Sequence, residues 1–216
     1  MRTLIISAHP DDEVIGAGGT IARHVSNGDD MYWCIVTEAH TPPWPEGTLA
    51  AAREQVEAVR KLLGIRETFF CGFPTVELNT VPYRELCSAL TRIIQQTQPV
   101  VVYTTPYEDI NLDHRIVYDA TLVATRPLAG NSVRRLLAYE ISTTNRFGQH
   151  VFSPNVFVDI SDFLNKKLEA LACYTAELRE FPHPRSLEGV ELLARERGLS
   201  IGVRAAECFQ LIREIL

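Results

Sequence analysis

The sequence lacks the patterns that would place the chain in a membrane or on a nucleic acid. No stretch approaches the 18 consecutive apolar residues of a spanning helix, and the apolar run 3–8 is far shorter than the core of a secretory signal. Basic residues are in the minority, with 21 Lys and Arg against 27 Asp and Glu and a formal net charge of -6. An acidic chain repels phosphate backbones. We therefore expect a soluble, cytoplasmic protein without a nucleic-acid partner or a membrane span.

Cysteine is scarce, and its spacing excludes two kinds of stabilising site. The five cysteines form an odd set with no C-x-x-C pair, so neither a zinc–thiolate site nor a disulfide framework is expected. Most lie in apolar surroundings such as "YWCIV" and "TFFCG". We interpret them as small buried hydrophobic residues in a reducing compartment.

Three common catalytic or nucleotide-binding motifs are also missing. There is no G-x-S-x-G elbow and no P-loop, which excludes the commonest serine hydrolases and nucleotide hydrolases. The stretch "GAGGT" has Ile21 where a dinucleotide-binding fingerprint needs its third glycine. Its glycines instead predict close packing of a first helix on a sheet.

Alternating strand and helix patterns define the fold class. The helical pattern is clearest over 49–63, where apolar residues recur every three or four positions and Gly64 follows. The pattern predicts an α/β, Rossmann-like, doubly wound and mostly parallel sheet with helices on both faces. Short β-branched and aromatic runs predict the first four strands, at 2–8, 31–37, 67–72 and 100–105.

The second half of the chain is expected to extend the same sheet, so that residues 1–216 form a single domain. Two proline-rich stretches, 40–47 and 181–186, are interpreted as surface loops and not as linkers. The extension is predicted to consist of strands at 134–142 and 155–160, a helix from Asp162 to Phe181 and a last strand at 206–215.

Two polar motifs follow predicted strands and could share one site. In "AHPDDE", Pro10 fixes a turn that lets His9 and Asp12 point inward together. An imidazole and a carboxylate are ordinary zinc ligands, and a hydrolytic zinc site needs a third. His114, after the fourth strand, is the candidate. If the first and fourth strands are neighbours at the switch point of the sheet, both loops face one crevice.

Each motif taken alone has a structural alternative. The acids at 11–13 could complement the positive end of the helix that follows, and Asp113 could cap the helix that His114 begins. His9 alone could be a satisfied polar residue at a strand end. Their combination at the two required strand ends favours a site. His150 and His183 have no ligand partner at suitable spacing.

The motifs "AHPDDE", "GAGGT" and "DHRIV", with "FVDISDFLNKKLEALACYTAEL" and "AECF" near the end, resemble the PIG-L or LmbE-like zinc-dependent N-deacetylases. That family acts on N-acetylglucosamine-type sugars. The resemblance implies that His9, Asp12 and His114 bind zinc and that Asp11, which is not a ligand, is the general base. Zinc would lower the pKa of its water to about 7 and polarise the acetyl carbonyl. Fe²⁺ or another divalent ion could replace it.

The resemblance implies roles for three further residues. Several members of the family have a histidine three residues before the last ligand, where this chain has Asn111. An asparagine can donate a hydrogen bond to an oxyanion but cannot transfer a proton, so the second acid stays open. Asp113 would orient a group beside the metal, and its partner need not be His114. Arg53 would contact the sugar; the alternative is a solvated pair with Glu57.

The expected function is hydrolytic removal of an N-acetyl group from a small molecule that contains N-acetylglucosamine. A related zinc amidase that cleaves a larger acyl group from an aminosugar conjugate is the main alternative. A metal- or sugar-binding module without turnover is a third reading, and the presence of Asp11 disfavours it. The resemblance also favours a homo-oligomer.

Overall fold

Strands and helices alternate through the first two thirds of the computed structural model, which describes residues 1–148 and 151–216. His150 lies outside the described residues. The strands are β1 (Arg2–Ser7), β2 (Asp30–Glu38), β3 (Glu67–Pro74), β4 (Val101–Thr104), β5 (Arg135–Tyr139), β6 (Val156–Asp159) and β7 (Ala206–Glu214). The helices are α1 (Asp12–Ser26), α2 (Thr48–Leu63), the short 3₁₀ helix η1 (Leu78–Thr80), α3 (Tyr83–Thr97), α4 (Leu112–Ala124), α5 (Leu164–Ala172) and α6 (Leu187–Leu199).

The seven strands form one sheet in the order β3-β2-β1-β4-β5-β7-β6. The five strands from β3 to β5 are parallel, whereas β7 pairs antiparallel with both β5 and β6. The predicted doubly wound sheet, its C-terminal extension and the pairing of the first and fourth strands are confirmed. Strand order reverses between β1 and β4, so a crevice forms where the loops leave their carboxyl ends.

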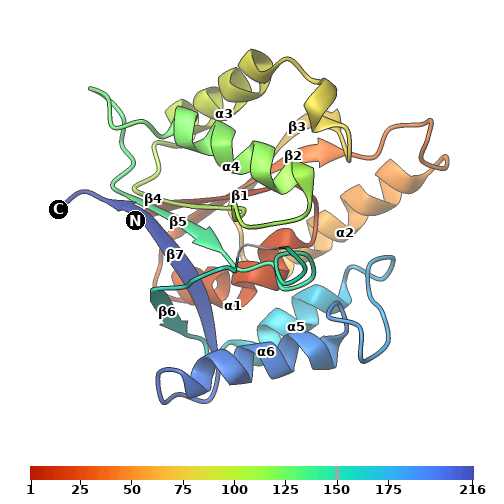
Figure 1. Cartoon of the computed structure of the whole chain (residues 1–216), viewed down its shortest axis with the longest axis vertical. Coiled ribbons are helices and arrows are strands. Elements are labelled where there is room, and N and C mark those ends of the chain that lie inside the picture. Colours follow the sequence, from red (N-terminus) through yellow and green to blue (C-terminus); the bar gives the residue numbers. More distant parts are fainter. Residues whose placement is uncertain (149–150) are drawn as a thin grey trace.

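Helices cover both faces of the sheet (Figure 1). Side chains alternate along β1, so that Ile5 packs with α1, α2 and α5 while Leu4 and Ile6 pack with α3 and α4. On the first face α1 approaches the sheet unusually closely. A Cβ added at Gly16 would lie 2.3 Å from a Tyr139 ring carbon, so the packing role predicted for the "GAGGT" glycines is confirmed.

The prediction of one helix from Asp162 to Phe181 is wrong. Helix α5 ends at Ala172, and the next amides, including that of Tyr174, bond three residues back instead of four. Burial of the Tyr174 ring, which is 1% exposed, overrides the helical pattern there. The sequence analysis also missed α6, which begins after Ser186, whose hydroxyl accepts a hydrogen bond from the Gly189 amide at 2.9 Å. The segment 181–186 is therefore the lead into a helix as well as a loop.

Candidate metal centre and active site

The loop between β1 and α1 forms a tight turn at the carboxyl end of β1. Its residue Asp11 has φ 100° and ψ -32°, a conformation that non-glycine residues rarely adopt. The Asp11 carbonyl accepts hydrogen bonds from the amides of Val14 and Ile15 at 3.1 and 3.0 Å, so it starts α1. The His9 amide donates to the Asp12 carboxylate at 2.9 Å. The turn thus brings the side chains of residues 9 and 12 to one side.

The second loop leaves β4, the neighbour of β1, and leads into α4. Asn111 is the N-cap of α4, and its side-chain oxygen accepts a hydrogen bond from the Asp113 amide at 3.0 Å. His114, 2% exposed, therefore lies in the first turn of the helix. The cap is Asn111, not Asp113 as the structural alternative supposed.

The two loops bring His9, Asp12 and His114 together. His9 Nδ1 lies 3.2 Å from His114 Nε2, and Asp12 lies 3.5 Å from the first nitrogen and 3.3 Å from the second. Among the described residues, these three form a group whose ligand atoms all lie within 4.8 Å of one another. Two imidazole nitrogens and a carboxylate oxygen are a donor set that suits a divalent transition metal such as zinc. The residues present therefore fit such an ion.

Each histidine is oriented by a carboxylate on its other ring nitrogen. His9 Nε2 lies 3.0 Å from Asp113, whose carboxylate also accepts from the Val76 and Leu78 amides at 2.6 and 3.3 Å. Asp113 thus faces the histidine of the other loop and not its sequence neighbour. A carboxylate behind a ligand histidine fixes the ring orientation and the tautomer.

Asp109 plays the same part for His114, and sequence reasoning missed it. Its carboxylate lies 2.9 Å from His114 Nδ1. It accepts hydrogen bonds from the Thr144 hydroxyl at 2.7 Å and from the backbone amide of Asn111 at 2.8 Å. The signal available in the sequence was an aspartate in the same loop five residues before the histidine.

These carboxylates also set the charge of the histidines. Burial alone would lower the pKa of His9, but hydrogen bonds to Asp113 and Asp12 raise it to about 9. Burial likewise opposes a charge on His114, yet Asp12 and Asp109 raise its pKa to about 10. The pKa of Asp12 is held below its usual range because both histidines outweigh its burial. The carboxylates thus favour a positive charge on both imidazoles.

Asp11 lies beside this group but is differently placed. The residue is 2% exposed, and its Oδ2 has no hydrogen-bond partner among the described residues. Burial, followed by repulsion from Asp12, raises the pKa of Asp11 to about 7, and Arg185 at 3.9 Å opposes the shift. A carboxylate with a pKa near 7 is well matched to general base catalysis at neutral pH.

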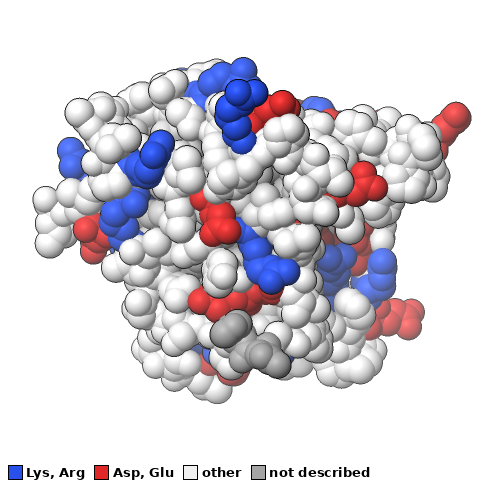
Figure 2. Space-filling view, turned by 45° about the horizontal axis from the view of Figure 1, so that its top comes forward, with Lys and Arg blue, Asp and Glu red and all other residues white. Residues whose placement is uncertain are grey.

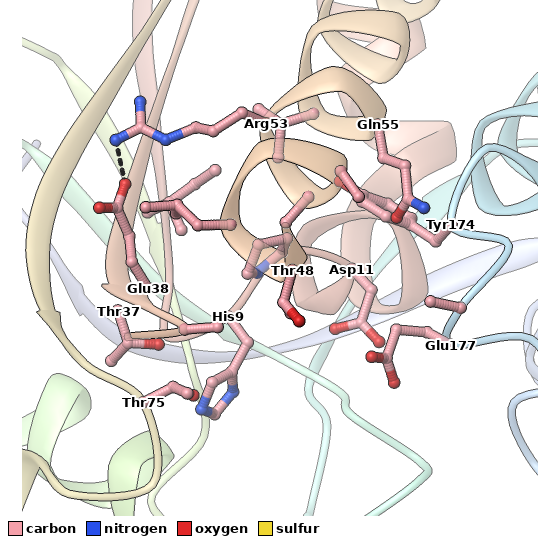
Figure 3. A pocket seen from close by; sticks show the side chains of 18 of the residues that line it. His9, Asp11, Thr37, Glu38, Thr48, Arg53, Gln55, Thr75, Tyr174 and Glu177 are labelled. Atoms are coloured by element: carbon pink, nitrogen blue, oxygen red, sulfur yellow. Dashed lines mark hydrogen bonds and ion pairs between the residues drawn. The ribbon is translucent and has the colours of Figure 1, made fainter. Parts of the chain in front are cut away.

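A cavity of about 430 Å³ opens beside His9 and Asp11. Asn111 and Arg53 line it as well, so four of the residues singled out in the sequence border this cavity. In Figure 3 the cavity runs along α2, with Asp11, Glu177 and Tyr174 on one side and Arg53 with Glu38 on the other. Apolar side chains of β2, β3 and α2 complete its walls: Ile35, Leu49, Ala52, Val56 and Phe70.

Arg53 reaches the cavity, although neither sequence-based reading described its actual partner. It pairs with Glu38 at the end of β2, and its guanidinium lies 3.4 Å from the centre of the Phe70 ring. Glu57 instead pairs with Arg60 at 2.7 Å. The solvated pair with Glu57 is therefore excluded, and Glu38 joins the residues that sequence reasoning missed.

Comparison with known proteins gives this geometry a context. The model of the PIG-L family, described as GlcNAc-PI de-N-acetylase, matches residues 4–125, more than half of the chain. A diacetylchitobiose deacetylase from Thermococcus kodakarensis is 30% identical over 195 residues, which cover 83% of this chain and 71% of that protein.

Solved structures extend the likeness to the whole fold. The N,N'-diacetylchitobiose deacetylase from Pyrococcus horikoshii superposes with a TM-score of 0.79 at 26% identity, covering 98% of this chain and 84% of that one. A 4-carboxy-2-hydroxymuconate hydratase from Pseudomonas putida KT2440 superposes with a TM-score of 0.81 at 21% identity, covering 100% and 98%. Because this fold also supports a hydratase, the reaction of this chain depends on the residues of its site and does not follow from the fold.

Proposed function

This chain belongs to the PIG-L family, and from that premise we propose that it is a zinc-dependent hydrolase that removes the N-acetyl group from an N-acetylated aminosugar. The observation that carries the proposal is that two unlike groups lie side by side next to one cavity. His9, Asp12 and His114 form a group that suits a metal ion, and Asp11 beside them has a carboxylate oxygen with no hydrogen-bond partner among the described residues. A module that only binds metal would have no use for such a buried acid.

In the proposed mechanism His9, Asp12 and His114 would hold the ion, and Asp113 and Asp109 orient the two rings. When bound, a divalent ion supplies Lewis acidity, which polarises the scissile carbonyl and makes water a better nucleophile. Fe²⁺ or another divalent ion would suit the same donor set, so the ion present in the cell is part of the proposal and not a premise.

Asp11 takes the proton of the attacking water and returns it to the sugar nitrogen, which must leave as an amine. Its pKa of about 7 suits both transfers, because the group can be deprotonated before attack and still hold a proton afterwards. One carboxylate can thus serve as base and then as acid. This removes the need for the second acid that Asn111 cannot supply.

Asn111 is proposed to assist the developing oxyanion by hydrogen bonding. Its oxygen is engaged in capping α4, so its amide hydrogens are the groups left to donate into the cavity. The expected contribution is electrostatic only. An asparagine provides less stabilisation of negative charge than a protonated histidine would at that position.

The cavity supports a small-molecule substrate of sugar type. The Arg53 and Glu38 pair offers a donor and an acceptor at the end away from Asp11, as hydroxyl recognition requires. On the face in Figure 2, Lys and Arg lie among Asp and Glu and form no continuous basic stripe there. The alternative substrate carries a larger acyl group, and the apolar walls beside α2 could accommodate one.

Three broader features complete the proposal. We place the enzyme in the cytoplasm because its five cysteines are free thiols, as in a reducing compartment. We also propose that residues 1–216 form one domain and that the protein is a homo-oligomer, which light scattering after size exclusion would test. No helix among the described residues is long and apolar enough to cross a membrane.

The decisive experiment measures acetate release. The protein is stripped of metal, reloaded separately with Zn²⁺ and Fe²⁺, and assayed on N-acetylglucosamine, N,N'-diacetylchitobiose and N-butanoylglucosamine. We expect metal-dependent release of acetate with formation of a free amine. Release of butanoate in preference to acetate would favour the larger-acyl alternative, and binding of metal without any acyl release would overturn the enzymatic proposal.

A further inference from the structure

The backbone of the proposed base is held in a costly conformation. A non-glycine residue at the φ of 100° seen for Asp11 costs on the order of 1–3 kcal/mol and persists only where its surroundings hold it. No hydrogen bond from a described residue orients the Asp11 carboxylate; its contact with a cation is the 3.9 Å approach of Arg185. The direction of the carboxylate is therefore set mainly by the backbone of the turn.

Glu13 holds the backbone of the Asp11 turn through a hydrogen bond. The Asp11 amide donates to Glu13 Oε2 at 3.1 Å, and Glu13 is completely buried as the second residue of α1. A buried carboxyl group needs partners on both oxygens, because an unmet acceptor loses its hydration without compensation. The partner of the other oxygen therefore determines where Glu13 can lie.

That partner is Tyr174, whose hydroxyl donates to Glu13 Oε1 at 2.6 Å. Tyr174 is 1% exposed and follows the end of α5, 161 residues from Glu13 in sequence and outside the range 4–125 matched by the family model. A chain of two hydrogen bonds thus links the second half of the molecule to the Asp11 turn.

We propose that Tyr174 is a positioning residue of the active site, which acts through Glu13 to hold Asp11 in its strained conformation. The inference rests on the proposed function for its catalytic consequence, but the hydrogen-bond chain exists independently of it. Loss of the Tyr174 hydroxyl frees Glu13, relaxes the turn and moves the carboxylate of the base. A displacement of about 1 Å at a reacting group can cost about 100-fold in rate.

The test is Tyr174→Phe, which keeps the ring and removes the hydroxyl. We expect kcat to fall about 100-fold, with KM within about twofold and the metal dissociation constant unchanged, since no ligand is touched. The matched control is Tyr103→Phe. Tyr103 is also buried, and its hydroxyl bonds to His24 at 3.0 Å; among the described residues no hydrogen bond links it to the Asp11 turn. The control should lose similar stability and retain its kcat.

A double-mutant cycle tests whether the effect passes through Glu13. Glu13→Gln leaves one acceptor for two donors, so it should reduce kcat by itself. Adding Tyr174→Phe should then cost little more, because both changes break the same chain. The proposal is overturned if the kcat losses of the two single variants multiply in the double variant. It is also overturned if Tyr174→Phe has the kcat of the Tyr103→Phe control.

A readout without turnover separates this inference from the proposed function. In metal-free protein, amide hydrogen exchange over residues 9–13 should be faster in Tyr174→Phe than in wild type and unchanged in Tyr103→Phe. If wild-type protein releases no acyl group but the three proteins differ in exchange as expected, the proposed function fails while the link stands. Equal exchange in all three proteins contradicts the link directly.

Discussion

Replacing Asp109 by asparagine should weaken metal binding without touching a ligand. In the protein Asp109 receives three hydrogen-bond donors: the His114 ring and the Thr144 hydroxyl on Oδ2, and the Asn111 amide on Oδ1. Asparagine has the same shape but offers one oxygen and one NH₂ group. Whichever way the new amide turns, at least one donor of the protein faces its NH₂ group: the His114 ring and the Thr144 hydroxyl in one orientation, the Asn111 backbone amide in the other.

The size of the effect follows from the two orientations. With its NH₂ group toward His114, the new amide donates to Nδ1 and moves the ring proton to Nε2, the atom that faces Asp12 and His9. With its NH₂ group toward the Asn111 backbone amide, a partly buried hydrogen bond worth about 1 kcal/mol is lost. Changing such an orienting carboxylate typically costs 10–100-fold in metal affinity, or about 1.4–2.8 kcal/mol.

Competition with a chromogenic chelator measures this affinity directly. Asp119→Asn is the matched control, because Asp119 is an exposed residue of α4, the helix that follows the Asp109 loop. We expect the Asp109 variant to show a Zn²⁺ dissociation constant higher by one to two orders of magnitude and the control to match wild type. An Asp109→Asn protein that binds zinc as tightly as the control would refute the role assigned to this carboxylate.

Three further predictions concern the base, the protons of the site and the first helix. Asp11→Asn should keep its metal but lose kcat by at least about 10³-fold, whereas His114→Ala should lose the metal itself; equal metal loss in elemental analysis would contradict this division. Because both imidazoles must be neutral to bind and their pKa values are raised to about 9 for His9 and about 10 for His114, metal affinity should rise from pH 6.5 to 9, with proton release seen by calorimetry in different buffers. Over the same pH range the free energy of unfolding of the metal-free protein should fall. The pKa of each histidine is higher in the folded protein than its unfolded value of about 6.5, so its contribution to stability is complete below that pH and is lost as the pH rises toward the folded-state pKa. Gly16→Ala should destabilise the fold by about 1–3 kcal/mol in urea unfolding, because its Cβ would overlap the Tyr139 ring; a midpoint equal to wild type would argue against the close packing.

Local signals were sufficient for the parallel part of the sheet but not for the C-terminal helices. Helix α2 repeats its apolar residues at helical spacing and ends at Gly64, which has φ 76°. Over 162–181, in contrast, the same spacing continues past the real end of α5. Beyond Ala172 the chain places the Tyr174 hydroxyl against Glu13, a long-range contact that no local pattern records. Helix α6 was missed because small residues, Ala194 and Gly198 among them, form its buried face and weaken the apolar signal.

The grouping of His9, Asp12 and His114 could be predicted because their loops leave the carboxyl ends of neighbouring strands, whereas the orienting residues could not be paired by sequence distance. Asp113 and His114 are neighbours, but successive helical residues point about 100° apart. Asp113 therefore faces His9 from the other loop, while Asp109 folds back on His114. The segment 109–114 thus carries one histidine of the group and the carboxylates behind both histidines. A small shift of this single loop would misalign both rings, so the hydrogen bonds of Asp109 with the Thr144 hydroxyl and the Asn111 backbone amide help to hold the whole group.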